Sequence, residues 1–461
     1  MLLALGEYLR REHKEIYGLY KYFFIVYPLF TLYYWLHLFL ADSLAFLFFS
    51  CSFWLILSQT YSEKFSYKTL LIASLSVWAL IFSSMTYLYV GIMLYAWIGY
   101  LAWKKDGVKM VFQIGIISAI PYLAYALFLL LTGTFHDFWV SNFVYNTKLY
   151  ISIPNYTRGE HFNPLKFMLT LIFNFYQGWI KQLTFIKSLD IYFPVATMMA
   201  CSTFVMLWLL FVKNRILFVL YFFLLSFSAP RSNVSSLSEA NYQAGVYMAL
   251  GLISTFIVLW KMKDVRFKHE SLEIGRKVAG FLVMLFFSFS IFFLIKNVYD
   301  KSFQRYTQAL PGIYELPDVK NFSHEIISPN DTVWIGPYIP QEMFYFDVSQ
   351  LPGKYISLLP QMSEDQYFSQ SFIQQFNENP PAMIIYKHDE SIFGNPADKF
   401  GSFFLEWMST RYQTIDSLEA YSIQKSPTAF NVGGDLYMRN DIFEKSVTTL
   451  ESKGYIRPLS E

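Results

Sequence analysis

The chain is divided into an apolar part and a more polar part. Up to Ile295 it consists of apolar runs of roughly 15–24 residues, close to the ~20 residues that a helix needs to cross a bilayer. After Asn297 the apolar runs become short and alternate with polar residues. This division predicts a polytopic α-helical membrane domain over residues 1–297, followed by a small soluble α/β domain over residues 298–461.

The composition places the chain among membrane proteins. Of its 461 residues, 54% are hydrophobic and 15% are charged, which is too apolar for a soluble chain of this length. The net charge of +2 gives no reason to expect a nucleic-acid partner. We expect Cys51 and Cys201, which lie in apolar runs, to be packing residues rather than a disulfide or a metal site. The start, MLLALGEYLRREHKE, carries its charges after its apolar stretch, so it predicts an amphipathic surface helix and no signal peptide.

Nine apolar segments are predicted to span the membrane. They are Tyr22–Ala41, Ser43–Ser58, Leu70–Ser83, Thr86–Trp103, Met110–Leu131, Ile191–Val212, Ile216–Ser228, Ala244–Trp260 and Val278–Ile295. A further segment, Leu165–Ile180, contains Asn174 and Gln177, and we expect it to lie in the interface rather than to span.

The distribution of lysine and arginine predicts the orientation. The basic loops contain Arg10 to Lys14, Lys64 and Lys68, Lys104 to Lys109, Lys213 and Arg215, and Lys261 to Lys277. With all of these loops in the cytoplasm, the nine spans alternate without conflict. The loops Gly133–Pro164 and Pro230–Tyr242 and the C-terminal domain are then extracytoplasmic, and the chain is a multi-pass protein of the cell (inner) membrane.

The C-terminal domain shows alternating strand and helix signals. Asp331–Gly336 and Ala382–Tyr386 read as buried strands bounded by proline and glycine, and Ser369–Asn377 and Phe403–Thr410 read as helices. The domain has no glycine-rich phosphate loop, metal-ligand spacing or nucleophile elbow. We therefore expect it to cap or recognise rather than to catalyse.

Asp42 is the carboxylate that stands out in the membrane domain. It lies at the predicted outer end of the first span and is the only acidic residue between Glu15 and Glu63. Acids near the bilayer are often functional, so Asp42 is a candidate catalytic or substrate-orienting group. It also suits a helix N-cap, which is the competing structural interpretation. His37, more than one turn before it, is a candidate sugar contact or an interfacial anchor.

The two larger outer loops supply further candidates. Aromatic and hydrogen-bonding side chains there could bind a sugar or an acceptor, namely His136, Asp137, Asn142, Tyr145, Tyr150, Glu239 and Tyr242. Lys148, Arg158 and Arg231 are candidates to hold a lipid phosphate. The alternatives are an ordinary aromatic interface belt and an arginine that reaches to lipid headgroups.

Several segments together are similar to a known enzyme family. The order of YPLFTLYYWLHLFLADSLAFLFFS, LLLTGTFHDFWVSNFVYNTKLY, APRSNVSSLSEANYQ and the C-terminal DTVWIGP, GKYISLLP and NPPAMIIY resembles the GT-C membrane glycosyltransferases of the bacterial protein-mannosyltransferase-like and aminoarabinose-transferase-like group. The resemblance covers nearly the whole chain. It implies transfer of a sugar, with inversion, from a polyprenyl-phosphate donor to a lipid, glycan or protein acceptor on the outer face.

The resemblance also assigns roles to residues. Asp42 matches the second acidic site of the family, and Arg231 is the nearest match to its donor-phosphate arginine, although this chain has Arg-Ser where the family often has Arg-Tyr. Family members begin with an earlier span and an acidic outer loop that carries the general base. Met1 matches the cytoplasmic helix after that loop, so we expect a chain without this base, either an N-terminally truncated copy or a degenerate member. A divalent metal at Asp42 is left open, and acceptor orientation is preferred.

Two other classes of protein fit the same sequence. A transporter or flippase for a lipid-linked sugar would use the same basic and aromatic loops, although the sequence has no clear internal repeat and no acid deep within a span. A non-catalytic scaffold would present the outer domain to partners. Substitution of Asp42 separates the three, because only an enzyme loses transfer while it keeps lipid binding.

Overall fold

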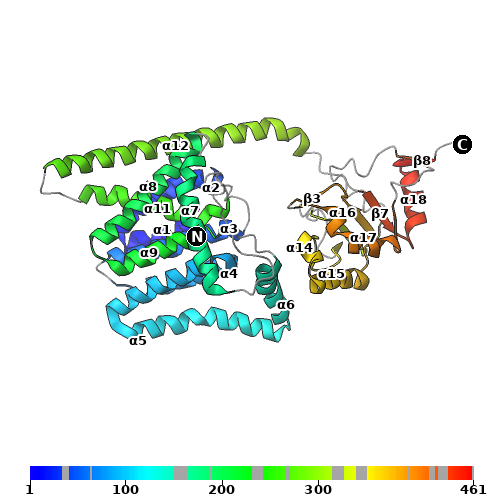
Figure 1. Ribbon diagram of the computed structural model, residues 1–461, viewed down its shortest axis with the longest axis horizontal. Helices are drawn as coiled ribbons and strands as arrows, with labels where there is room; N and C mark the ends of the chain where they lie inside the picture. The colour runs from blue at the N-terminus through cyan, green and yellow to red at the C-terminus, as the bar shows by residue number, and fades with distance from the viewer. Residues whose placement is uncertain are drawn as a thin grey trace. The chain divides into compact units, whose positions relative to one another are not determined.

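The computed structural model divides the chain into two compact units, Met1–Tyr306 and Thr307–Glu461 (Figure 1). It describes residues 1–33, 41–62, 65–149, 163–185, 189–230, 242–264, 270–313, 327–338, 350–392, 394–414, 421–423 and 435–458. Within these ranges only the backbone is described at 33, 41–42, 145–149, 182–185, 189–192, 242, 262–264, 270–272, 301–313, 421–423 and 458. Each unit is described by itself.

The first unit is built from helices. They are α1 (Leu2–Glu12), α2 (Lys14–Tyr33), α3 (Ala41–Tyr61), α4 (Tyr67–Ser83), η1 (Met85–Tyr87), α5 (Leu88–Leu131), α6 (Phe135–Trp139), η2 (Val140–Leu149), α7 (Pro164–Phe185), α8 (Leu189–Phe211), α9 (Arg215–Phe227), η3 (Tyr242–Ala244), α11 (Gly245–Asp264) and α12 (Glu270–Ile313). The predicted N-terminal amphipathic helix is confirmed as α1, which buries Leu2, Leu5 and Leu9 on one side.

Four helical segments among the described residues are long and apolar enough to cross a membrane. They are Ser43–Tyr61, Met85–Leu131, Phe193–Phe211 and Glu273–Asp300, and α4, α9 and α11 are shorter apolar helices. The predicted apolar segments therefore form helices over their described residues, and the chain has helices suited to a bilayer. Residues 34–40 of the predicted span Tyr22–Ala41 lie outside the described residues. The number of crossings stays a prediction.

α5 is a helical hairpin rather than one long span. Its backbone leaves the helical region at Asp106 and Gly107, and Gly107 has φ +64° and ψ −155°. The hydroxyls of Tyr95 and Tyr122 lie 3.1 Å apart, whereas in a straight helix their positions would be about 40 Å apart. The two legs therefore fold back on each other and correspond to the predicted segments Thr86–Trp103 and Met110–Leu131.

The helices differ in how deeply they lie in the bundle. The apolar window of α3 is 72% buried, whereas that of α12 is only 11% buried. Trp54 of α3 is fully buried and contacts Tyr20 and Phe23 of α2 edge-on. Because α12 and the second leg of α5 expose large apolar side chains such as Phe289 and Phe112, their outer faces are suited to lipid.

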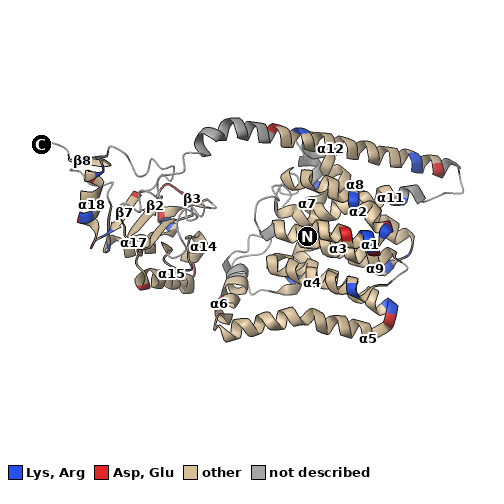
Figure 2. Cartoon of the chain, turned by 180° about the vertical axis from the view of Figure 1, so that it is seen from behind, with Lys and Arg blue, Asp and Glu red and all other residues tan. Residues whose placement is uncertain are grey.

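Charges gather at one end of the first unit. Figure 2 shows lysine and arginine concentrated near α1, the turn of α5 and the start of α12. Contacts also bring the end of α11 and the turn of α5 to the end of α3, since the Lys261 ammonium lies 4.9 Å from the Tyr61 ring and the Lys105 ammonium lies 6.0 Å from the Phe65 ring. This grouping is what the predicted alternation of loops requires. Which end faces the cytoplasm stays a prediction.

The second unit contains a small mixed sheet. Its elements are β1 (Val333–Gly336), α14 (Pro360–Ser363), α15 (Gln366–Glu378), β2 (Met383–Tyr386), β3 (Ser391–Ile392), β4 (Asn395–Pro396), α16 (Ala397–Phe400), α17 (Ser402–Ser409), β5 (Tyr412–Thr414), β6 (Tyr421–Ile423), β7 (Asp435–Arg439), α18 (Phe443–Ser452) and β8 (Ile456–Pro458). The main sheet has the order β1-β2-β7-β5, with β1 and β2 parallel and the other pairs antiparallel.

An aromatic core holds this unit together. Trp334 of β1 is fully buried and meets Phe372, Phe376 and Phe404 edge-on at centroid distances of 5.9, 5.7 and 5.1 Å. Phe372 and Phe376 come from α15 and Phe404 comes from α17, so these helices cover the strand. Both predicted strands and both predicted helices are confirmed here. The predicted domain boundary at Asn297, in contrast, falls inside α12, which continues as a helix to Ile313.

Candidate functional site

The predicted site residues fall into three groups. His37, Tyr150, Arg158, Arg231 and Glu239 lie outside the described residues. Asp42 is the second residue of α3, Tyr145 and Lys148 lie in η2, and Tyr242 begins η3, but only their backbone is described. The side chains of His136, Asp137 and Asn142 are described.

Two of these residues belong to elements at the same end of the first unit. The Tyr87 hydroxyl donates to the Gln243 carbonyl at 3.3 Å, which joins the start of α5 to η3. α4 ends at Ser83, four residues before Tyr87, and its partner α3 begins at that same end because the two helices are antiparallel neighbours. α3 also contacts η3. The first turn of α3, with Asp42, and the first residue of η3, Tyr242, are thus at one end of the bundle.

α6 and η2 follow the second leg of α5. His136 and Asp137 are exposed on α6. Asn142 donates from Nδ2 to the Phe138 carbonyl at 3.0 Å, one turn earlier in the chain, so its amide nitrogen is engaged locally. Trp139 stacks on Phe143 with ring centroids 4.6 Å apart, and Phe138 contacts Tyr125 of α5. These rings therefore pack on one another, and the interface belt stays a prediction.

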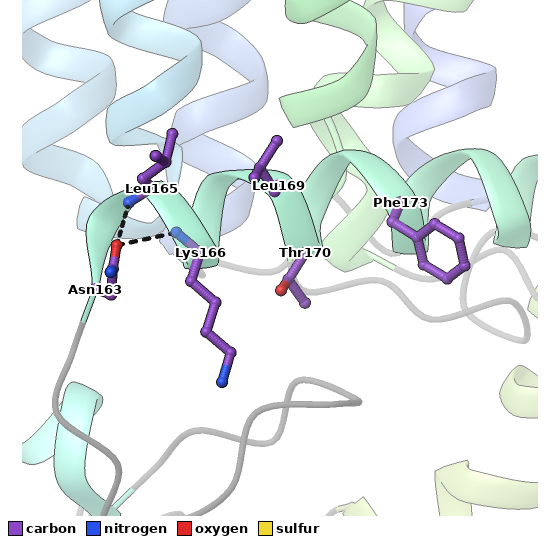
Figure 3. A pocket seen from close by; sticks show the side chains of 6 residues that line it. All are labelled: Asn163, Leu165, Lys166, Leu169, Thr170 and Phe173. Atoms are coloured by element: carbon purple, nitrogen blue, oxygen red, sulfur yellow. Dashed lines mark hydrogen bonds between the residues drawn. The ribbon is translucent and has the colours of Figure 1, made fainter.

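α7 runs across the ends of other helices. Figure 1 and Figure 3 both show it crosswise to its neighbours. It contacts the start of α5, where the Tyr89 hydroxyl donates to the Pro164 carbonyl at 3.1 Å, and the end of α9, where Tyr176 stacks on Phe222. It also contacts the start of α11, where Trp179 Nε1 donates to the Tyr247 hydroxyl at 3.0 Å. The interfacial position of Leu165–Ile180 stays a prediction.

The start of α7 is fixed by its sequence. Asn163 accepts hydrogen bonds at Oδ1 from the backbone amides of Leu165 and Lys166, at 3.0 and 3.1 Å, as a helix N-cap does (Figure 3). Pro164 follows at the first helical position, where its fixed φ and missing N–H are suited to a helix start. Asn163 and Lys166 are thereby placed on one side of the helix.

A hollow of about 430 Å³ lies along this side of α7, lined by Asn163, Leu165, Lys166, Leu169, Thr170 and Phe173. Figure 3 shows Lys166, Thr170 and Phe173 extending from the same side of the helix, at a spacing of one and two turns. The hollow therefore combines a cation, an amide and a hydroxyl with apolar side chains. Such a combination can hold an anionic headgroup with an apolar tail.

The sequence interpretation missed this hollow, although its signals are present. The letters NPLKFMLTL contain the N-cap, the first-position proline and a lysine one turn on. Among the residues that the structure describes, no group of three or more His, Cys, Asp or Glu side chains could hold a metal ion. The chain has no match among family models, curated proteins or solved structures.

Proposed function

We propose that this chain is a membrane glycosyltransferase of the GT-C type. It transfers a sugar from a polyprenyl-phosphate donor to an acceptor at the outer face of the cell membrane. The observation that carries the proposal is the hollow on α7, which sets Lys166 and Asn163 beside Leu169 and Phe173. α7 runs across the helix ends at the predicted outer side, where the headgroup of a lipid-linked sugar would lie.

The groups of the hollow match the two halves of such a donor. The Lys166 ammonium is a strong partner for a phosphate, and the Thr170 hydroxyl can add a hydrogen bond. Leu169 and Phe173 offer apolar area to the first isoprene units of the tail. In this proposal Lys166 joins or replaces Arg231, Lys148 and Arg158 as a group that binds the donor phosphate.

In the proposed reaction, negative charge develops on the leaving phosphate of the donor, and the acceptor hydroxyl loses a proton. The bond from the sugar C1 to the phosphate oxygen breaks, and the electron pair leaves with the phosphate. The acceptor hydroxyl forms the new bond to C1, and its proton passes to water at the membrane surface. A cation beside the leaving phosphate stabilises its developing charge. In the proposal Asp42 accepts the hydrogen bond of the acceptor hydroxyl and orients it toward C1.

The direct test is donor turnover. The full chain is reconstituted in liposomes with decaprenyl phosphate that carries a labelled hexose or pentose, and membranes of the source cells are added as acceptor. A transferase releases free decaprenyl phosphate and moves the label to a new product. A flippase would move the intact donor between leaflets without releasing decaprenyl phosphate, and a scaffold would do neither, so either result would overturn the proposal.

Three variants assign the parts of the proposed site. Lys166→Gln should weaken donor binding by roughly 10-fold or more, the loss expected for a charge-assisted hydrogen bond. Lys181→Gln makes the same change of charge on α7 outside the hollow, so it should leave binding unchanged. Asp42→Asn should keep donor binding and lose transfer. If Lys166→Gln and Lys181→Gln bind the donor equally well, the hollow is not part of the donor-binding site.

A further inference from the structure

A second hollow, of about 400 Å³, lies on the second unit beside the edge strand β5. It is formed where α15 ends, where α17 passes into β5 and where β7 ends. Its apolar wall consists of Phe376, Trp407 and Tyr412. Two arginines, Arg411 and Arg439, line the same hollow. A volume of this order is in the range of small-ligand sites.

The two arginines are in different states of pairing. Arg439 uses its Nε and Nη2 atoms for a two-pronged contact with Asp441, at 2.7 and 3.1 Å, and its Nη1 donates to the Pro380 carbonyl. Arg411 donates only from Nη1, to the Trp407 carbonyl at 3.0 Å and to the Thr410 hydroxyl at 3.1 Å. Its Nε–Nη2 edge makes no hydrogen bond to another described residue, and no described carboxylate lies within 4.0 Å of it.

Arg411 is also held in place. Its guanidinium lies over the Trp407 ring, 5.1 Å from the ring centroid, and its Nη1 is tied to the backbone. Arg439 binds a carboxylate with its Nε–Nη2 edge. The same edge of Arg411 is held in a fixed position, but no anion from the described part of the chain occupies it. A planar guanidinium edge binds carboxylate or phosphate through two parallel hydrogen bonds, and a fixed one loses less entropy on binding.

Two amides complete the hollow. Asn377 accepts from Trp407 Nε1 at 2.8 Å, which leaves its Nδ2 as a donor without a described partner. Asn440 donates from Nδ2 to the Thr410 carbonyl at 3.2 Å, which leaves its Oδ1 as an acceptor. A donor and an acceptor near an aromatic wall match sugar hydroxyls, because each hydroxyl both donates and accepts.

We propose that this hollow binds an anionic sugar, with its carboxylate or phosphate on the Nε–Nη2 edge of Arg411 and its hydroxyls on Asn377 and Asn440. The described groups supply the oxyanion contact, the hydroxyl contacts and an apolar wall in one cavity. The site lies wholly in the second unit and does not depend on the hollow of α7 or on the transfer reaction.

Isothermal titration of the full chain in nanodiscs tests the site. The probes are glucuronate and glucose 6-phosphate, with glucose, acetate and inorganic phosphate as fragments of them. We expect saturable binding of at least one anionic sugar, about 10-fold or more tighter than each fragment. Arg411→Gln and Arg411→Lys should each weaken it by about 10-fold or more, since lysine keeps the charge and loses the two-pronged edge.

Lys445→Gln is the matched control, because it removes one exposed positive charge of the same unit outside the hollow. This variant should bind the anionic sugar with the affinity of the unchanged protein. Whichever of glucuronate and glucose 6-phosphate binds more tightly shows whether the site prefers a carboxylate or a phosphate. The proposal is overturned if neither anionic sugar binds, if acetate or inorganic phosphate binds equally well, or if the Arg411→Lys variant keeps full affinity. A loss of the same size in Lys445→Gln would also overturn it, since the effect would then come from the general positive charge of the unit and not from the Arg411 edge.

Discussion

Trp179 and Tyr247 form a buried polar contact that fixes α7 to α11. Tyr247 has no exposed surface, and its hydroxyl accepts from Trp179 Nε1. Trp179→Phe should lower the stability of the first unit by about 1–3 kcal/mol, because the buried hydroxyl loses its donor. The apparent melting temperature in detergent measures the effect. Trp139→Phe, at a side chain that is 49% exposed, is the control and should change it little; equal losses in both would contradict this role.

The pair Arg439 and Asp441 predicts a pH dependence in the second unit. The hydrogen bonds from Arg439 hold the pKa of the Asp441 carboxyl below its usual range. The pair therefore stabilises the folded state above the pKa of the unfolded chain, about 4, and this contribution is lost as the pH falls through the lower folded value. Asp441→Asn should reduce the fall in melting temperature between about pH 5 and pH 3. Asp389→Asn, which changes an exposed acid elsewhere in the unit, should retain the full fall, and the same fall in Asp441→Asn would refute the assignment.

At the scale of elements, the turn of α5 depends on Gly107. Its φ and ψ, +64° and −155°, lie in a region that glycine alone populates readily. Gly107→Val should therefore destabilise the hairpin by about 1–3 kcal/mol or more, and loss of the Tyr95–Tyr122 contact should accompany it. Gly115→Ala lies in the second leg with open space around it, so it should be neutral or slightly stabilising. Thermal unfolding of both variants in detergent distinguishes them, and a neutral Gly107→Val would show that the turn tolerates other backbone angles.

The elements also show how far the sequence could lead. Long apolar runs and the basic residues between them mark the helices of the first unit, and even the two legs of α5 are separated by Lys104 and Lys105. The end of α12 could not be predicted in this way, because the helix continues to Ile313 after its apolar residues stop. β5 has three residues and β3 and β4 have two each, too few to form a pattern of their own. The hollow of α7 could have been predicted from the sequence, because Asn163, Pro164 and Lys166 are neighbours in it. The hollow beside β5 could not, because its residues lie between 376 and 441 and only the fold brings them together.

At the scale of the whole molecule, the membrane prediction rests on two independent features. Exposed apolar side chains cover α12 and the second leg of α5, and the basic residues of α1, of the turn of α5 and of the start of α12 gather at one end of the first unit. A soluble bundle is not expected to show both features. Exposed apolar faces are unfavourable in water, and a soluble bundle does not need its basic residues at one end. The nine predicted spans place five crossings, an odd number, between the turn of α5 and the second unit, so this topology predicts that the two lie on opposite sides of the membrane.

Labelling of single cysteines tests this arrangement. The native Cys51 and Cys201 are buried, so they should contribute little background with a membrane-impermeant maleimide. Ser452→Cys, exposed on α18, should react in cells whose outer layers have been made permeable while the inner membrane is intact. Lys109→Cys, exposed after the turn of α5, should react only after the inner membrane is opened. Reaction of both positions from the same side would mean an even number of crossings between them. If both react only after the inner membrane is opened, the second unit lies inside the cell and cannot meet an acceptor outside it.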